Sequence, residues 1–187
     1  MEKIRAYFNS LITLSDEAWS DFASCIRREQ VSKKEFLLRE GEVCDFIAFI
    51  GEGMVRFYYV DKGDEKVTAF FFPGDFLSNY RSFLNRQPSD HYIEAMKDVV
   101  MYKVTKNDLH ALYDKHPSID RLGRLIAENL YLTVTKRLDS FLYSTPEERY
   151  KELQDRNSIL LQQVPQYMLA SYLGVKPETL SRIRSRK

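Results

Sequence analysis

The feature that most restricts the fold is a run of short apolar segments between about Val31 and Val104. They are rich in β-branched and aromatic residues, and turn-forming Gly, Pro and Asp residues separate them. The strand candidates are 35–39, 46–50, 54–60, 66–72, 91–96 and 99–104. Short strands at nearly even spacing are typical of a jelly-roll-like β-barrel. Because helical patterns flank this block on both sides, we expect an α+β fold.

Helical periodicity precedes and follows the block of strands. The first thirty residues are expected to be helical, and Ser15 is the expected N-cap of a helix within them. After the strands, Thr105 or Asn107 is expected to cap a short helix over 108–115.

The longest helical pattern runs from Pro117 to about Tyr143. A helix of this length exceeds what a small domain needs internally, so we expect it to pair with a second copy of the chain. The alternative is a helix that packs only on its own barrel. The expected dimerisation residues lie at three- and four-residue steps and are Leu122, Ile126, Leu130 and Thr133.

A second helical module is expected after a break at Ser144. Thr145, Pro146 and the acids that follow form a strong helix start, and 158–164 is expected to be a link or short strand. Further on, a short helix ends at Gly174 and a second helix begins near Pro177. This spacing predicts a helix-turn-helix.

The second helix of this motif is expected to present polar and charged side chains outward while Leu180 and Ile183 face inward. The outward set is Lys176, Glu178, Thr179, Ser181, Arg182 and Arg186. Such side chains can bind base edges and phosphates. Residues 1–116 carry a net charge of −3 and residues 117–187 a net charge of +4, which places the positive charge beside this helix. A helical hairpin with a solvated charged face is the alternative.

The composition argues against several other classes. The two cysteines and three scattered histidines offer no cluster or helical pair for a metal, and no cofactor is expected. An enzyme of the small-barrel type would need His and carboxylate ligands on the strands, and only His91 lies on one. No apolar run approaches the length of a bilayer span, and the N-terminus lacks a secretory core. We therefore expect a soluble, cytoplasmic protein that is not an enzyme.

Several local motifs resemble those of the cyclic-AMP receptor/fumarate-nitrate regulator (Crp/Fnr) family of bacterial transcription factors. The matching segments are Glu40–Glu42, Phe49–Gly53 followed by Val55, Phe72–Phe76, Leu173–Val175 and Glu178–Ile183. The resemblance covers about residues 15–187. It implies a cyclic-nucleotide-binding-like sensor over 1–116, a dimerisation helix over 117–143 and a DNA-binding helix-turn-helix over 144–187. The chain stops soon after the second helix, so we expect no full β-wing.

The resemblance also assigns roles to single residues. It places the base-reading Glu and Arg at Glu178 and Arg182, and a phosphate-contacting position at Gln166. A third base-contacting Arg of the family falls on Pro177, so part of that readout is missing. In members that bind cyclic nucleotides, a Glu holds the ribose and an Arg-Ser pair holds the phosphate; here these positions are Asn79 and Ser89-Asp90.

An Asp where an anion would sit repels it. We therefore expect a degenerate effector pocket that does not bind cyclic AMP tightly, formed by Asn79, Tyr80, Arg81, Ser89 and Asp90. The expected partners are double-stranded DNA with an inverted repeat and a second copy of the chain, with an unknown small-molecule effector and RNA polymerase as candidates. No membrane partner is expected. A cyclic-nucleotide-binding-like sensory module without a direct DNA role is the alternative function.

Overall fold

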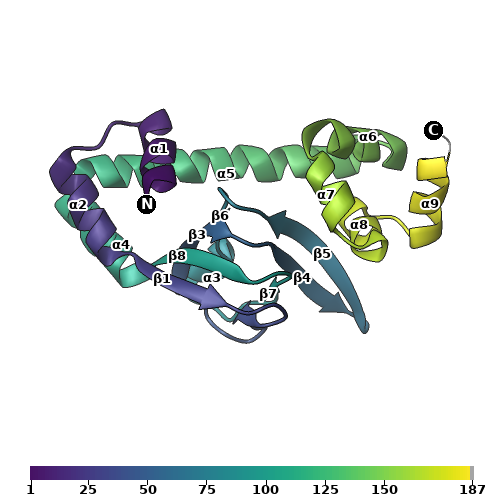
Figure 1. Ribbon diagram of the computed structural model, residues 1–187, viewed down its shortest axis with the longest axis horizontal. Helices are drawn as coiled ribbons and strands as arrows, with labels where there is room; N and C mark the ends of the chain where they lie inside the picture. Colours follow the sequence, from purple (N-terminus) through teal and green to yellow (C-terminus); the bar gives the residue numbers. More distant parts are fainter. Residues whose placement is uncertain (186–187) are drawn as a thin grey trace. The chain divides into compact units, whose positions relative to one another are not determined.

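The computed structural model describes residues 1–185 and separates into two compact units (Figure 1). Unit 1 contains residues 1–57 and 70–129. Unit 2 contains residues 58–69 together with the described chain from Leu130 onward. The two units thus each combine segments that are distant in the sequence.

The expected block of strands is present as two sheets with the orders β1-β8-β3-β6 and β2-β7-β4-β5. The strands are β1 (Arg27–Val31), β2 (Phe36–Leu38), β3 (Phe46–Glu52), β4 (Val55–Asp61), β5 (Asp64–Phe71), β6 (Phe76–Leu77), β7 (Tyr92–Ala95) and β8 (Val99–Thr105). Strand β8 pairs antiparallel with both β1 and β3. Within the described chain the strands pair as two separate sheets, so the expected barrel is not a closed ring.

Two elements of unit 1 differ from the sequence-based expectation. The helix predicted through the first thirty residues stops at Cys25, and Arg27–Val31 pairs with β8 as strand β1. This polar segment has no strand periodicity of its own, and tertiary pairing decides its structure. A short helix, α3 (Tyr80–Asn85), also forms where none was predicted, and Asn79 caps it by accepting a hydrogen bond from the amide of Ser82 at 3.2 Å.

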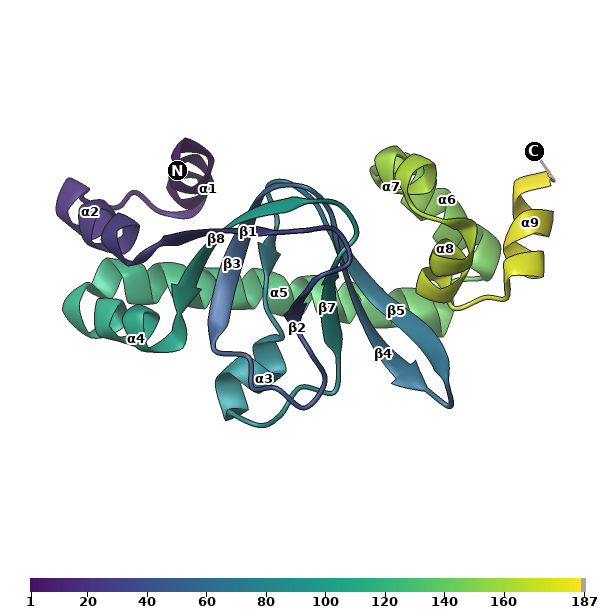
Figure 2. The same cartoon turned by 60° about the horizontal axis from the view of Figure 1, so that its bottom comes forward.

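The core of unit 1 draws side chains from strands of both sheets and from the helices that precede and follow them in the chain. Figure 2 shows these helices and strands from a second direction. Alternating side chains of the strands enter it, as the period of two requires; Val99 and Met101 of β8 are both almost fully buried. The surrounding helices are α1 (Glu2–Leu11), α2 (Asp16–Cys25) and α4 (Lys106–Lys115). Ser15 and Thr105 cap α2 and α4 as predicted.

The long helix α5 (Pro117–Tyr143) has the predicted bounds and crosses from unit 1 into unit 2 after Asn129. The predicted helix start at Thr145 is confirmed: its side chain and that of Glu148 form a reciprocal capping box at α6 (Pro146–Arg156). No helix in the described chain is both long and apolar enough to cross a membrane.

The segment after α6 was predicted as a link or short strand, and this was wrong. It forms helix α7 (Ser158–Gln163), because Asn157 caps it and Leu160 buries its apolar side chain. Helices α8 (Gln166–Leu173) and α9 (Pro177–Ser185) follow. From Pro146 to Ser185 the described chain is helical with short links.

Candidate DNA-binding surface and effector pocket

The predicted helix-turn-helix consists of α8 and α9. Gly174 lies between them with φ +68°, a left-handed conformation that side chains rarely adopt. Its amide and that of Val175 donate to carbonyl groups of the last turn of α8. Leu180 and Ile183 of α9 are buried against α8, as predicted. The motif therefore has a small apolar core that fixes the second helix.

The outer face of α9 is exposed to solvent. The exposed members of the predicted set are Lys176, Glu178, Ser181 and Arg182, and Thr179 is half-buried. Arg182 and Thr179 lie one turn apart, and the Arg182 guanidinium donates to the Thr179 hydroxyl at 3.4 Å. Gln166, at the start of α8, is also exposed. Arg186 lies outside the described residues.

The four predicted dimerisation residues lie on one side of α5, but their surroundings change along the helix. Leu122 is 2% exposed and belongs to the core of unit 1, and Ile126 packs against that core. Their side chains are thus covered within one chain and do not form a free interface. Leu130 and Thr133 are exposed.

The C-terminal half of α5 carries a stripe of exposed apolar side chains. We call this set the α5 stripe; it consists of Leu130, Tyr131, Val134 and Leu138. Their steps of three and four residues place them on one side of a helix. Thr133 is offset from the centre of this stripe by about a quarter turn at roughly 100° per residue.

The segment that corresponds to the nucleotide clamp is closed by its own hydrogen bonds. The Asn79 side-chain amide donates to the Ser89 hydroxyl at 2.7 Å, and both residues are less than 5% exposed. The Ser89 hydroxyl also donates to the carbonyl of His91 at 2.7 Å. The backbone of Ser89 pairs with the turn at Gly41 and Glu42. The polar groups of Ser89 are therefore occupied from within the chain.

The neighbouring charges pair with one another. The Arg81 guanidinium donates to the carboxylate of Asp90, and His91 Nδ1 lies 2.7 Å from the other carboxylate oxygen. The hydrogen bond from Arg81 lowers the pKa of Asp90 to about 2, so this group is an anion at neutral pH. Tyr80, the remaining predicted pocket residue, stacks on Phe83 of α3.

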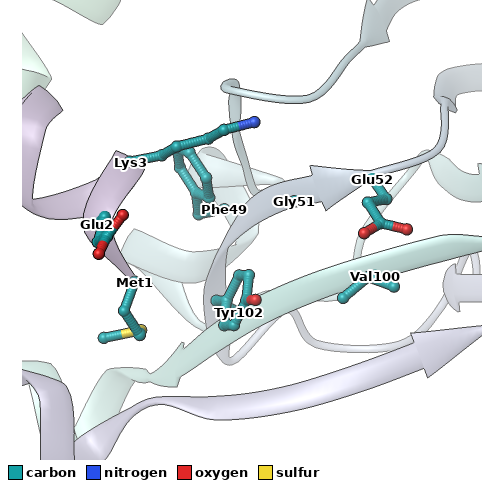
Figure 3. A pocket seen from close by; sticks show the side chains of 8 residues that line it. All are labelled: Met1, Glu2, Lys3, Phe49, Gly51, Glu52, Val100 and Tyr102. Carbon is teal, nitrogen blue, oxygen red and sulfur yellow. The ribbon is translucent and has the colours of Figure 1, made fainter.

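A separate shallow pocket lies between the start of α1 and the sheet (Figure 3). Its volume is about 340 Å³. The lining residues are Met1, Glu2, Lys3, Phe49, Gly51, Glu52, Val100 and Tyr102. It shares no residue with the predicted effector pocket. Among the described residues, no group of His, Cys, Asp and Glu side chains could hold a metal ion.

Sequence reasoning missed the residues that hold α8 in place. Ser171 of α8 hydrogen bonds to the β4–β5 hairpin 104 positions earlier in the chain. Arg137 and Arg149 bind carbonyl groups at the end of α8. No local pattern indicates such partners. Only the aromatic residues Phe141 and Tyr172 in the sequence could have suggested ring partners for these two cations.

Comparisons with known proteins agree with this arrangement. Residues 28–116 match the cyclic nucleotide-binding domain family. An anaerobic regulatory protein of Aggregatibacter actinomycetemcomitans is 24% identical over 174 residues; the match covers 86% of this chain and 66% of that protein's length.

Two solved structures share the fold. FixK2 from Bradyrhizobium japonicum has a TM-score of 0.69 at 20% identity and covers 86% of this chain and 83% of its own. A regulator assigned to the Crp/Fnr family from Eubacterium rectale has a TM-score of 0.71 at 15% identity, with 92% and 83% covered.

The fold and the exposed second helix define a class: a cyclic-nucleotide-binding-like domain joined through a long helix to a helix-turn-helix. The chain is similar over most of its length to the anaerobic regulatory protein, and it shares the fold of FixK2 and of the Crp/Fnr regulator from Eubacterium rectale.

Proposed function

We propose that this chain is a homodimeric, sequence-specific DNA-binding regulator whose effector pocket no longer binds cyclic AMP. The observation that carries the proposal is the exposed face of α9. Its inward residues are buried, whereas Glu178, Ser181 and Arg182 project from the opposite side. Arg can donate to two acceptors of a guanine edge, and Glu can accept from cytosine. The role of this surface is recognition and not catalysis.

Dimerisation is supported by the α5 stripe. Val134 and Leu138 are 58% and 56% exposed, although water solvates such aliphatic side chains poorly. Pairing two copies along the stripe would bury these residues and present two α9 helices to successive major grooves. A two-fold dimer of this kind fits an inverted repeat in the DNA.

The loss of cyclic AMP binding is supported by the closed clamp segment. A cyclic phosphate needs hydrogen-bond donors and a positive charge. The hydroxyl of Ser89 is already bonded to Asn79 and His91, and the Arg81 guanidinium is bonded to Asp90. The Asp90 anion adds repulsion. Any small-molecule effector of this regulator would therefore have a different chemistry.

Selection of binding sites from random duplex DNA tests the proposal. The wild-type protein should enrich an inverted repeat with half-sites about 10 base pairs apart, centre to centre. The Arg182→Ala variant should lose or relax the preference at one base pair of each half-site, with a cost of about 1–3 kcal/mol.

Arg184→Ala is the matched control, because Arg184 is an exposed arginine of the same helix that points away from the Arg182 side. It should weaken binding evenly across sequences. Failure of the wild-type protein to enrich any site would contradict the proposal and favour a sensory module without a direct DNA role. RNA polymerase is a further proposed partner, which a footprint of polymerase beside the enriched site would test.

A further inference from the structure

The C-terminal end of α8 is held by two arginines from other helices. The last carbonyl groups of a helix have no partner within it. Arg137 of α5 donates from Nη2 to the Tyr172 carbonyl at 3.0 Å, and Arg149 of α6 donates from Nε to the Leu173 carbonyl at 3.1 Å. Two cations at this end also interact favourably with the helix dipole. Both arginines are half-buried.

Aromatic rings fix the direction of these guanidinium groups. Arg137 Cζ lies 3.9 Å from the centre of the Tyr172 ring and 5.0 Å from that of Phe141. Arg149 Cζ lies 5.0 Å from the centre of the Phe141 ring. A planar guanidinium that is stacked and hydrogen bonded in this way has little rotational freedom. We call Arg137, Phe141, Arg149 and Tyr172 the arginine clamp.

The clamp also holds the link between α5 and α6. Arg149 donates from Nη1 to the carbonyl of Ser144 at 2.6 Å. The same guanidinium therefore joins the link to the end of α8. The turn of the motif lies against the clamp as well, because a Cβ atom on Gly174 would come within 2.7 Å of Phe141 Cε1. Helix α5, the link and the helix-turn-helix thus meet at one cluster of side chains.

We propose that Arg137 and Arg149 are positioning residues that fix the orientation of α9 relative to the C-terminal half of α5. In a dimer paired along α5, this orientation sets the distance between the two α9 helices and so the spacing of the DNA half-sites that the protein accepts. The spacing part rests on the proposed function, whereas the orientation within one chain does not.

The orientation is tested without DNA. Nitroxide labels are attached through Asp139→Cys in α5 and Arg184→Cys in α9, on a Cys25→Ser, Cys44→Ala background. The labelled full chain is diluted with unlabelled chain, and the distance distribution is measured by pulsed electron paramagnetic resonance. Arg149→Met should broaden the distribution by about twofold, because hydrogen bonds to the end of α8 and to the link are lost together.

Two further variants make this test specific. Arg149→Lys keeps the charge but lacks the planar fork, so it should also broaden the distribution. Arg156→Met removes an equal charge from the exposed end of the same helix and should leave the distribution unchanged. Circular dichroism confirms that each variant is folded. Equal widths for folded Arg149→Met and Arg156→Met would overturn the inference, whether or not the chain binds DNA.

The consequence for spacing is tested on duplexes that carry the selected half-sites with one or two base pairs inserted or removed. The wild-type affinity should fall by about tenfold for each step away from the preferred spacing, because both α9 helices can no longer bind at once. In Arg137→Met and Arg149→Met the fall should be about threefold or less, while affinity for a single half-site is kept. An unchanged spacing profile in variants with a broadened distance distribution would overturn the spacing part alone.

Discussion

The hydroxyl of Ser171 in α8 accepts a hydrogen bond from the backbone amide of Val67 in β5 at 2.9 Å. It donates in turn to the carbonyl of Glu65 at 3.2 Å. Strand β5 lies at the edge of its sheet, where backbone groups lack a neighbouring strand. One side chain of the helix-turn-helix therefore satisfies two backbone groups of the β4–β5 hairpin, within unit 2.

Ser171→Ala should loosen the hairpin. The variant leaves the Val67 amide and the Glu65 carbonyl without the hydroxyl, which should cost about 1 kcal/mol. Hydrogen exchange at the Val67 amide, followed by NMR, should accelerate by about fivefold, the equivalent of that energy. Ser185→Ala, which removes an exposed hydroxyl from α9, is the control and should leave this amide unaffected. Unchanged exchange in Ser171→Ala would show that other contacts hold the hairpin.

Val134→Lys should convert a dimer into a monomer. A charge at the centre of the α5 stripe would be desolvated on pairing, which should raise the dissociation constant by at least about 100-fold. Sedimentation equilibrium measures the change. Leu132→Lys is the matched control and should leave the dimer intact. Leu132 is 64% exposed, as an apolar residue of the same helix, but it lies on the opposite side of α5. If Leu132→Lys dissociates the dimer and Val134→Lys does not, a different face of α5 mediates pairing.

Asn79→Ala should destabilise unit 1. The side chain of Asn79 caps α3 and binds the Ser89 hydroxyl, and its removal leaves that hydroxyl buried with one partner fewer. We expect a loss of about 1–3 kcal/mol in the free energy of unfolding. Chemical denaturation measures this loss, with Asn107→Ala, an exposed residue of α4, as the control. A loss of stability no greater than that of the control would contradict the stabilising role of the two Asn79 hydrogen bonds.

Asp21 should make the attachment of α2 to the end of α4 sensitive to acid. Lys115 Nζ and His116 Nε2 each lie 2.6 Å from the same carboxylate oxygen of Asp21. Hydrogen bonds from Lys115 and then His116 lower the pKa of Asp21 below its ordinary value of 3.8. The stabilisation is therefore fully present above pH 3.8 and is lost as the pH falls through the lowered pKa.

The variant Asp21→Asn should melt at a lower temperature than the wild type at pH 6. The difference in melting temperature should shrink as the pH falls below 3.8 through the lowered pKa of Asp21, where the wild-type carboxylate of the folded protein becomes protonated. Melting followed by circular dichroism across this range checks the prediction. If the difference in melting temperature between the two proteins stays constant at the lowest pH measured, the effect comes from packing and not from charge.

Prediction from the sequence succeeds where a local pattern determines the structure. Gly174, the cap at Thr145 and the apolar positions of α9 indicate their elements directly, since turns and caps depend on neighbours in the chain. Strand β1 could not be found in this way, because its polar residues become a strand only by pairing with β8. The segment 158–164 was assigned wrongly for a related reason: the six residues of α7 are too few to show a helical period.

At the site, too, some features follow from a local sequence pattern and others depend on tertiary contacts. The exposure of Glu178 and Arg182 follows from the positions of Leu180 and Ile183 on the same helix. The choice of face on α5 does not follow from its sequence, because apolar residues lie on more than one side of this helix. Leu122 and Ile126 face the core of unit 1, whereas the α5 stripe begins after that core ends. Only the three-dimensional structure separates the two faces.

On the proposed function, the pocket that Asn79 and Ser89 close with their own side chains stays closed at every concentration of cyclic nucleotide. The activity of such a regulator depends on the concentration of the protein and not on the concentration of a cyclic nucleotide. Where a dimer is the binding species and most of the protein is monomeric, DNA occupancy rises with the square of the protein concentration. For such a dimer, a twofold change in copy number of the chain gives about a fourfold change in active dimer.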